Sequence, residues 1–217
     1  MDLPEIVVVS TSSIDGKARG YKKTQRLSQI YPLSKKVLEE IHTLRSRADA
    51  IMVGANTVRL DNPYLTVRYA KVKKKPYRVT ISKNCNFDPS SNIFNTDAST
   101  IVITSKNSNK EIVKVLKKKG INVIKCGTTT VDIKKALLLL KRKGINKILV
   151  EGGPNLLSGL FNLNLIQKLV LITYPIIIGK NKPLLLFNEK IKRLIKTRMI
   201  KSFVVNEFVI RFYKILS

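Results

Sequence analysis

The stretch Ile148–Leu156, with the sequence ILVEGGPNL, is the most informative part of the chain. Its apolar run predicts a buried strand, and Pro154 predicts the first turn of a helix, where no backbone N–H is needed. The two glycines between them let backbone N–H groups approach a ligand closely, and a helix N-terminus favours an anion. A tight strand-to-helix turn that needs glycine only for its geometry is the alternative. Glu151 either caps this turn or faces a ligand, where it can bind a ribose hydroxyl or assist proton transfer.

Outward from this stretch, helices alternate with short apolar strands. Strands are predicted over Glu5–Thr11, Ala50–Val53, Arg78–Ser82, Thr100–Thr104, Asn122–Cys126, Lys147–Glu151, Lys168–Thr173 and Ile176–Ile178. Helices are predicted over Ser34–Arg47, Asn109–Lys119, Val131–Lys143 and Leu156–Phe161. The alternation predicts an α/β fold with a mostly parallel sheet flanked by helices. At the C-terminus, Arg193–Val204 and Glu207–Leu216, joined at Asn206, predict an antiparallel hairpin that makes the sheet mixed.

The length and the composition favour a globular protein of one domain over residues 1–217, because neither a repeat nor a linker interrupts it. The net charge is +27, from 41 Lys and Arg against 14 Asp and Glu. A basic surface can bind nucleic acid, and nucleic-acid binding is therefore a competing hypothesis. The charge is spread in short clusters without a nucleic-acid motif or interleaved aromatics, which favours compositional drift and predicts no specific nucleic-acid partner.

The sequence also predicts the compartment and the absence of a metal. No apolar run approaches the roughly 20 residues that cross a bilayer, and the acidic start Met1–Glu5 leads straight into a strand rather than a signal peptide. We therefore expect a cytoplasmic protein without a membrane partner. Cys85, Cys126 and the single histidine His42 are too few for a zinc site and predict buried structural groups.

Two further turns carry polar side chains directly after predicted strands. The strand that ends at Val53 leads into Gly54 and then delivers Thr57, Asp61 and Arg68, a set suited to grasping a polyhydroxylated phosphate ester. The first strand leads into Ser13–Lys17, SIDGK, where a lysine beside a carboxylate can polarise a carbonyl or pair with phosphate. Each turn, taken separately, could be an ordinary loop.

Taken together, the three stretches resemble one family. IDGK at 14–17, HTLRSRADAIMVGANTVRLDNPYLTVR at 42–68 and ILVEGGPNLLSGLF at 148–161 are similar to the riboflavin-biosynthesis reductases. These are the stand-alone 2,5-diamino-6-ribosylamino-4(3H)-pyrimidinone 5′-phosphate reductases and the reductase domain of the bifunctional deaminase–reductase. The resemblance covers nearly the whole chain. It implies a dihydrofolate-reductase-like fold, a homodimer, and NADPH-dependent reduction of the ribosyl group of a pyrimidine riboside phosphate to a ribityl group.

The resemblance also implies roles for individual residues. The expected NADPH contacts are Thr57, Asp61, Gly152, Gly153, Pro154 and Asn155. The expected substrate contacts are Arg45, Leu65, Arg68 and Glu151, with the two arginines near the phosphate. Lys17 is expected beside the ribose carbon that receives hydride, and Lys17 and Glu151 are the catalytic candidates.

One departure from the family pattern refines this prediction. The family often has an Asp after the strand that corresponds to Arg78–Ile81, whereas this chain has Ser82 and Lys83. That pair would suit the 2′-phosphate of NADPH, and a surface loop is the alternative. The chain also lacks the His/Cys zinc signature of the deaminase half, which predicts a reductase alone that acts before deamination. Reduction of the deaminated 5-amino-6-ribosylaminouracil phosphate is the alternative.

Overall fold

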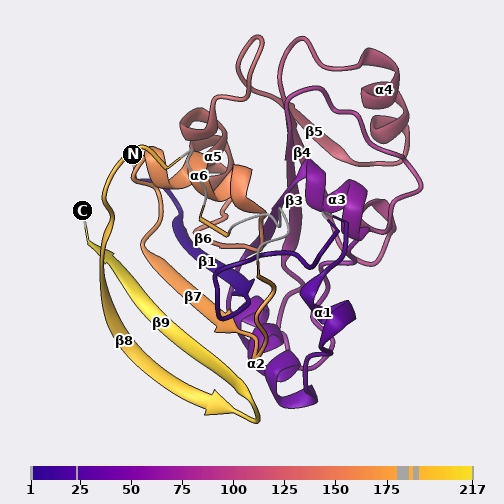
Figure 1. Ribbon diagram of the computed structural model, residues 1–217. Helices are drawn as coiled ribbons and strands as arrows, with labels where there is room; N and C mark the ends of the chain where they lie inside the picture. The colour runs from indigo at the N-terminus through magenta and orange to yellow at the C-terminus, as the bar shows by residue number, and fades with distance from the viewer. Residues whose placement is uncertain (1, 23, 180–185, 188–190, 217) are drawn as a thin grey trace. The chain divides into compact units, whose positions relative to one another are not determined.

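The structure, a computed structural model, describes residues 2–22, 24–179, 186–187 and 191–216 (Figure 1). The chain divides into two compact units. The first unit combines Met1–Glu5 with Leu44–Leu149, and the second combines Ile6–Thr43 with Val150–Ser217. That the two units form one domain over residues 1–217 stays a prediction.

Parallel strands form the centre of the first unit. Its strands are β2 (Ala50–Gly54), β3 (Tyr77–Ser82), β4 (Thr100–Thr104), β5 (Asn122–Lys125) and β6 (Lys147–Val150). They lie side by side in the order β5-β4-β3-β2-β6, and β2, β3, β4 and β5 pair in parallel. β4 is buried along its whole length and β2 in all but its last residue, which explains why they appear in the sequence as continuous apolar runs.

Short helices, two of them with polar side-chain caps, cover this sheet. They are α3 (Ala55–Asp61), the 3-10 turn η1 (Asn92–Phe94), α4 (Lys110–Lys118) and α5 (Ile133–Arg142). Asn109 caps α4 by accepting from two backbone N–H groups, and Asp132 caps α5 in the same way with one. Val58 of α3 and Leu116 of α4 pack with Ile51 of β2 in one buried cluster. The apolar spacing of these helices is thus explained by burial on the sheet.

The second unit holds the mixed part of the sheet. Its elements are β1 (Glu5–Ser12), α1 (Leu27–Ile30), α6 (Pro154–Asn162), β7 (Lys168–Thr173), β8 (Lys196–Val205) and β9 (Phe208–Leu216), and α2 (Lys35–Ser46) begins in it. β1 pairs with β7 in parallel, whereas β9 pairs antiparallel with both β7 and β8. Figure 1 shows β8 and β9 (yellow) curving together as a long hairpin. Asn206 makes its turn at φ 54°, a conformation that asparagine tolerates.

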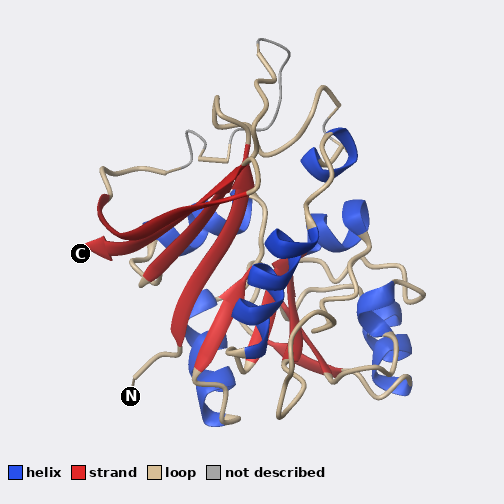
Figure 2. Ribbon diagram, turned by 90° about the horizontal axis from the view of Figure 1, so that it is seen from below, coloured by secondary structure: helices blue, strands red, loops and turns tan. Residues whose placement is uncertain are grey.

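The predicted alternation of strands and helices is confirmed, as is the C-terminal hairpin (red strands and blue helices in Figure 2). Two details differ. The strand predicted over Ile176–Ile178 is wrong: this segment is a loop after β7, and the backbone N–H of Ile178 donates to a side chain instead of a neighbouring strand. Residues 55–61, taken as part of a turn, form α3.

Candidate active site

Lys17 lies in a turn that follows β1, and hydrogen bonds between Ser13 and Lys17 close this turn. The Ser13 backbone N–H donates to the carbonyl of Lys17 at 2.9 Å, and the Lys17 N–H donates to Ser13 Oγ at 2.9 Å. Gly16 adopts φ 76°, which only glycine reaches without strain. The order Ser-Ile-Asp-Gly-Lys therefore forms this turn locally, and it leaves Lys17 half-buried.

The Asp15 carboxylate is held by three hydrogen bonds. Ser13 Oγ donates to Asp15 Oδ1 at 2.5 Å, the Ile178 N–H donates to Oδ1 at 3.1 Å, and the Gly179 N–H donates to Oδ2 at 2.9 Å. Burial raises the pKa of this carboxyl, but the hydrogen bonds from Ser13, Gly179 and Ile178 outweigh it and bring the pKa to about 2. Asp15 is therefore ionised at neutral pH and joins two loops of the second unit.

The glycine turn after β6 leads directly into α6. Gly153 is the N-cap residue, with φ −76° and ψ 174°, and Pro154 stands in the first helical turn as the sequence predicts. The Gly153 carbonyl accepts from the N–H groups of Leu156 and Leu157. Glu151 is half-buried, and Asn155 is exposed.

The two glycines of this turn differ in what they require. A Cβ on Gly152 would come within 2.8 Å of the Leu156 Cδ2 atom, so packing against α6 explains a glycine there. The backbone of Gly153, by contrast, is in an extended conformation that any residue adopts. Backbone geometry therefore explains no need for glycine at position 153.

The first unit carries the predicted residues that follow β2. Thr57 and Asp61 are half-buried and stand four residues apart on α3, which puts them on one side of that helix. Arg45 Nη1 donates to the Thr66 carbonyl at 2.9 Å and so fixes the segment that leads to the exposed Arg68. This bond to Thr66 was not foreseen from the sequence.

Leu65 has an unusual backbone and a buried side chain. Its φ is 51°, a left-handed conformation that a non-glycine residue seldom adopts. The side chain is only 3% exposed and packs with Ile51, Val53 and Val58 in the core of the first unit. A ligand would therefore meet the backbone of Leu65 and not its side chain.

Ser82 is the last residue of β3, and Lys83 begins the loop that follows, which hydrogen bonds tie to the loop after β4. Ser82 is buried, and its Oγ accepts from the Cys85 N–H at 3.0 Å. The Lys83 carbonyl accepts from Ser105 Oγ at 2.8 Å, while the Lys83 side chain is exposed. Burial raises the pKa of the Cys85 thiol to about 11, although Lys125 and Thr104 oppose this. Both cysteines are free and buried, and His42 is buried as well.

The predicted site residues thus form two groups, one in each unit. Lys17 and Glu151–Asn155 belong to the second unit, and the other predicted residues belong to the first. Asp15 and Ser13, which hold the Lys17 turn, were not predicted as site residues. The signal for them is the Ser-x-Asp-Gly order, which is typical of a side-chain-stabilised turn.

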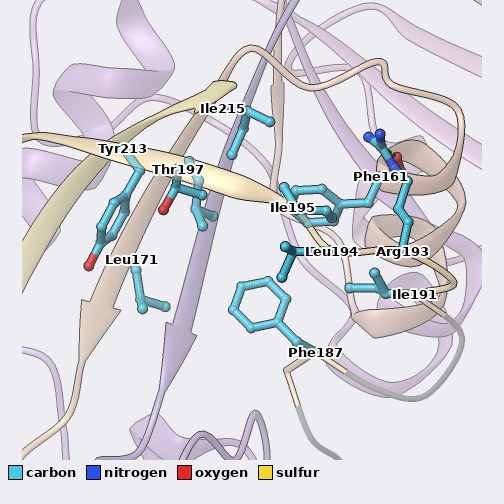
Figure 3. A pocket seen from close by; sticks show the side chains of 11 residues that line it. Phe161, Leu171, Phe187, Ile191, Arg193, Leu194, Ile195, Thr197, Tyr213 and Ile215 are labelled. Atoms are coloured by element: carbon cyan, nitrogen blue, oxygen red, sulfur yellow. Dashed lines mark hydrogen bonds between the residues drawn. The ribbon is translucent and has the colours of Figure 1, made fainter. Parts of the chain in front are cut away.

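An apolar hollow of about 390 Å³ lies elsewhere in the second unit (Figure 3). Side chains of α6, β7, β8, β9 and the segment before β8 line it, among them Phe161, Leu171 and Tyr213. Among the lining residues that the structure describes, Arg193 is the charged one, and it donates through Nη2 to the Phe161 carbonyl at 3.1 Å. None of the predicted site residues, all of which the structure describes, is among its lining residues.

Two further properties concern only the residues that the structure describes. There, no group of three or more His, Cys, Asp or Glu side chains is arranged to hold a metal ion. No helix in the same part of the chain has the length and apolar character needed to cross a bilayer.

A comparison with known protein families identifies the family of this chain. A model of the RibD C-terminal domain matches residues 4–209. The chain belongs to the RibD C-terminal domain family. The resemblance that the three sequence stretches carry is therefore confirmed, and a reductase family of this kind implies a nicotinamide cofactor.

Relatives of this RibD C-terminal domain are reductases of riboflavin biosynthesis. The 2,5-diamino-6-ribosylamino-4(3H)-pyrimidinone 5′-phosphate reductase of Aquifex aeolicus is 34% identical over 222 residues, which cover 100% of this chain and 99% of that protein. The protein of the same name from Archaeoglobus fulgidus is 33% identical over 186 residues, 81% of this chain and 82% of its own.

Solved structures agree on the fold of this RibD C-terminal domain. The RibD of Acinetobacter baumannii superposes with a TM-score of 0.81 at 17% identity, over 99% of this chain. The match covers 59% of that RibD chain, so this chain spans little more than half of its length. At this identity the likeness concerns the fold alone, and it confirms the expected dihydrofolate-reductase-like α/β arrangement.

Proposed function

We propose that this chain uses NADPH to reduce the ribosyl group of 2,5-diamino-6-ribosylamino-4(3H)-pyrimidinone 5′-phosphate to the ribityl form in riboflavin biosynthesis. Identity of 34% over the full length of the Aquifex aeolicus reductase supports both the reaction and the substrate. The Archaeoglobus fulgidus relative carries the same name and supports the diamino compound rather than the deaminated one.

The observation that carries the cofactor site is the backbone conformation of Gly153. Its φ of −76° and ψ of 174° suit any residue, so the backbone conformation does not require glycine, and the close approach of a ligand to the backbone would be a reason for one. Thr57, Asp61 and the Gly152–Asn155 turn would hold the cofactor. Ser82 and the exposed Lys83 would face its 2′-phosphate, which would favour NADPH. When bound, the nicotinamide supplies a hydride.

The remaining residues act on the substrate. The exposed guanidinium of Arg68 would pair with the 5′-phosphate, together with Arg45, which also fixes the segment 65–68 through Thr66. Leu65 would contribute its backbone N–H or carbonyl. Lys17 would lie by the ribose carbon that is reduced, and Glu151 would bind a ribose hydroxyl and assist proton transfer. Positioning is the main part of this chemistry.

We also infer a cytoplasmic homodimer. The two buried free thiols suit a reducing compartment. On β8, Met199, Ile200 and Val204 expose 57%, 56% and 67% of their surface, which makes the C-terminal hairpin a candidate contact between two copies. Light scattering of the purified protein tests this: a monomeric mass at micromolar concentration would contradict it.

The activity is tested by mixing the purified chain with NADPH and following the loss of NADPH absorbance. We expect oxidation only when the diamino ribosylaminopyrimidine phosphate is present, and Glu151→Gln should lower turnover with an unchanged circular dichroism spectrum. Turnover with the deaminated compound alone would reassign the substrate. No turnover with either compound would contradict the proposed function.

A further inference from the structure

Three hydrogen bonds connect the backbone of Lys17 to the loop after β7. The Lys17 N–H donates to Ser13 Oγ at 2.9 Å, and Ser13 Oγ in turn donates to Asp15 Oδ1 at 2.5 Å. Asp15 Oδ2 accepts from the Gly179 N–H at 2.9 Å. The position of Lys17 is thereby linked to a segment that lies more than 160 residues away in the sequence.

Backbone contacts reinforce the same junction. The Ile14 N–H donates to the Ile176 carbonyl at 2.9 Å, and the Ile178 N–H donates to Asp15 Oδ1 at 3.1 Å. The segment from Ile176 to Gly179 lies in no strand or helix, so these contacts define where it lies. Asp15 is the side chain on which both loops converge.

We propose that Asp15 is a positioning residue of the reductase: its carboxylate locks the Ser13–Lys17 turn against Ile178–Gly179 and so sets where the Lys17 ammonium acts. The inference rests on the proposed function, in which Lys17 touches the substrate. It assigns Asp15 no contact with substrate or cofactor.

The arrangement requires a carboxylate rather than an amide of the same shape. All three groups around Asp15 are donors, and a carboxylate offers only acceptors. In Asp15→Asn, the side-chain NH₂ would face either the Gly179 N–H or the donors at the other oxygen. At least one bond is then replaced by the opposition of two donors, and the turn moves relative to the loop.

A matched control exists in an exposed turn of the first unit. Asp88 accepts from the Ser90 N–H at 2.8 Å and from Ser90 Oγ at 2.7 Å, so it makes the same kind of Asp–Ser contact as Asp15. It has no role in the proposed site. Asp88→Asn therefore measures what the loss of such a turn contact does by itself.

The experiment is a double-mutant cycle on kcat with Asp15→Asn, Lys17→Ala and the double variant. We expect Asp15→Asn to lower kcat roughly tenfold, because a small displacement of a catalytic group has an effect of this order or larger. The dissociation constant of NADPH should change less than about twofold. In the Lys17→Ala background, the same change should lower kcat less than about twofold, since the group that Asp15 positions is gone. Asp88→Asn should leave kcat unchanged.

A second variant separates positioning from folding. Ser13→Ala removes the link between Asp15 and Lys17 but keeps the bonds of Asp15 to Ile178 and Gly179. Ser13→Ala should also lower kcat. It therefore tests the proposal even if Asp15→Asn proves insoluble.

The outcomes distinguish the catalytic role of Lys17 from the positioning role of Asp15. If Lys17→Ala keeps wild-type kcat, the role given to Lys17 in the proposed function fails. If Lys17→Ala is impaired but neither Asp15→Asn nor Ser13→Ala is, only the positioning role fails. Equal effects of Asp15→Asn with and without Lys17 would also overturn it, because Asp15 would then act independently of Lys17.

Discussion

Two charged side chains each fasten loops to a sheet, and they do so at opposite ends of strands. Arg78, at the amino end of β3, is fully buried, whereas Asp15, in the turn beyond the carboxyl end of β1, is half-buried. The Arg78 guanidinium donates to Thr100 Oγ1 at 3.0 Å, Asn95 Oδ1 at 2.6 Å, the Asn95 carbonyl at 2.5 Å, the Asn92 carbonyl at 3.4 Å and the Ala98 carbonyl.

The difference between these two regions follows from which end of a parallel sheet receives ligands. Ligands bind beyond the carboxyl ends of the strands, so loops at the amino ends can close completely over a charge. Arg78 accordingly serves the fold of the first unit alone. Asp15 accepts hydrogen bonds from Ser13 and from the loop after β7, and Lys17 stays half-buried rather than covered. We therefore expect Arg78 to affect stability and the residues at the carboxyl ends to affect ligands and catalysis.

The largest expected effect is that of Arg78→Met. Methionine fills much of the space but leaves the carbonyls of Asn92, Asn95 and Ala98 without their donor. We expect the free energy of unfolding to fall by about 3 kcal/mol, the order found when several buried polar groups lose a charged partner. Urea unfolding measures it. The kcat of the folded fraction should remain within about twofold of wild type.

Lys75→Met is the matched control, because Lys75 also donates to a carbonyl of this loop. Its Nζ reaches the Asp97 carbonyl at 3.0 Å on the surface. Loss of such an exposed bond should change stability by no more than about 0.5 kcal/mol. If Arg78→Met is equally mild, the buried arginine is not the anchor of this loop.

Gly153→Val, at a carboxyl end, should show the opposite pattern. We expect the dissociation constant of NADPH to rise roughly tenfold because the side chain crowds the backbone's approach to phosphate. The melting temperature should change little, since the backbone at this residue is extended. Isothermal titration and a thermal melt together check both parts.

Gly144→Val provides the reverse control. Gly144 has φ 81° and open space around its Cβ position, so valine there brings backbone strain and no crowding. It should lower the melting temperature and leave NADPH binding unchanged. Normal NADPH binding by Gly153→Val would mean that the turn is only architectural.

Much of the fold was predictable because local signals agreed with burial. The β-branched run Glu5–Thr11 and the cap Asn109 identify a strand and a helix at nearly their observed bounds. The apolar run Ile176–Ile178 misled, since its backbone bonds to Ile14 and to the Asp15 side chain in the turn after β1 rather than to a neighbouring strand. The seven-residue α3 was missed because it begins immediately after β2, within a stretch that has the signals of a turn.

The site was predictable as a set of residues but not as a set of contacts. Sequence motifs point to Lys17, Arg45 and Leu65 without saying how the chain holds them. The bond from Arg45 to Thr66 and the burial of the Leu65 side chain depend on packing between distant segments. The contact of Asp15 with Ile178 spans 163 residues, a separation that no local pattern encodes.

The smallest expected effect is a dependence of stability on pH. The pKa of Asp15 is lowered from 3.8 to about 2 in the folded protein, so its contribution is complete above the ordinary value and is lost as the pH falls toward about 2. The stability difference between wild type and Asp15→Asn should therefore be constant from about pH 7 down to about pH 5 and shrink below about pH 4.

Arg78 supplies the contrast for this measurement. A guanidinium stays protonated throughout this range, so any pH dependence of the difference between wild type and Arg78→Met would come from the carboxylate of Asp97, whose charge acts on Arg78, and not from Arg78 itself. Urea unfolding of the three proteins at several pH values tests both statements. A pH-independent difference for Asp15→Asn would mean that the two loops are held by their backbone contacts and not by the charge of Asp15. The carboxyl-end anchor would then depend no more on its ionisation than the buried arginine does.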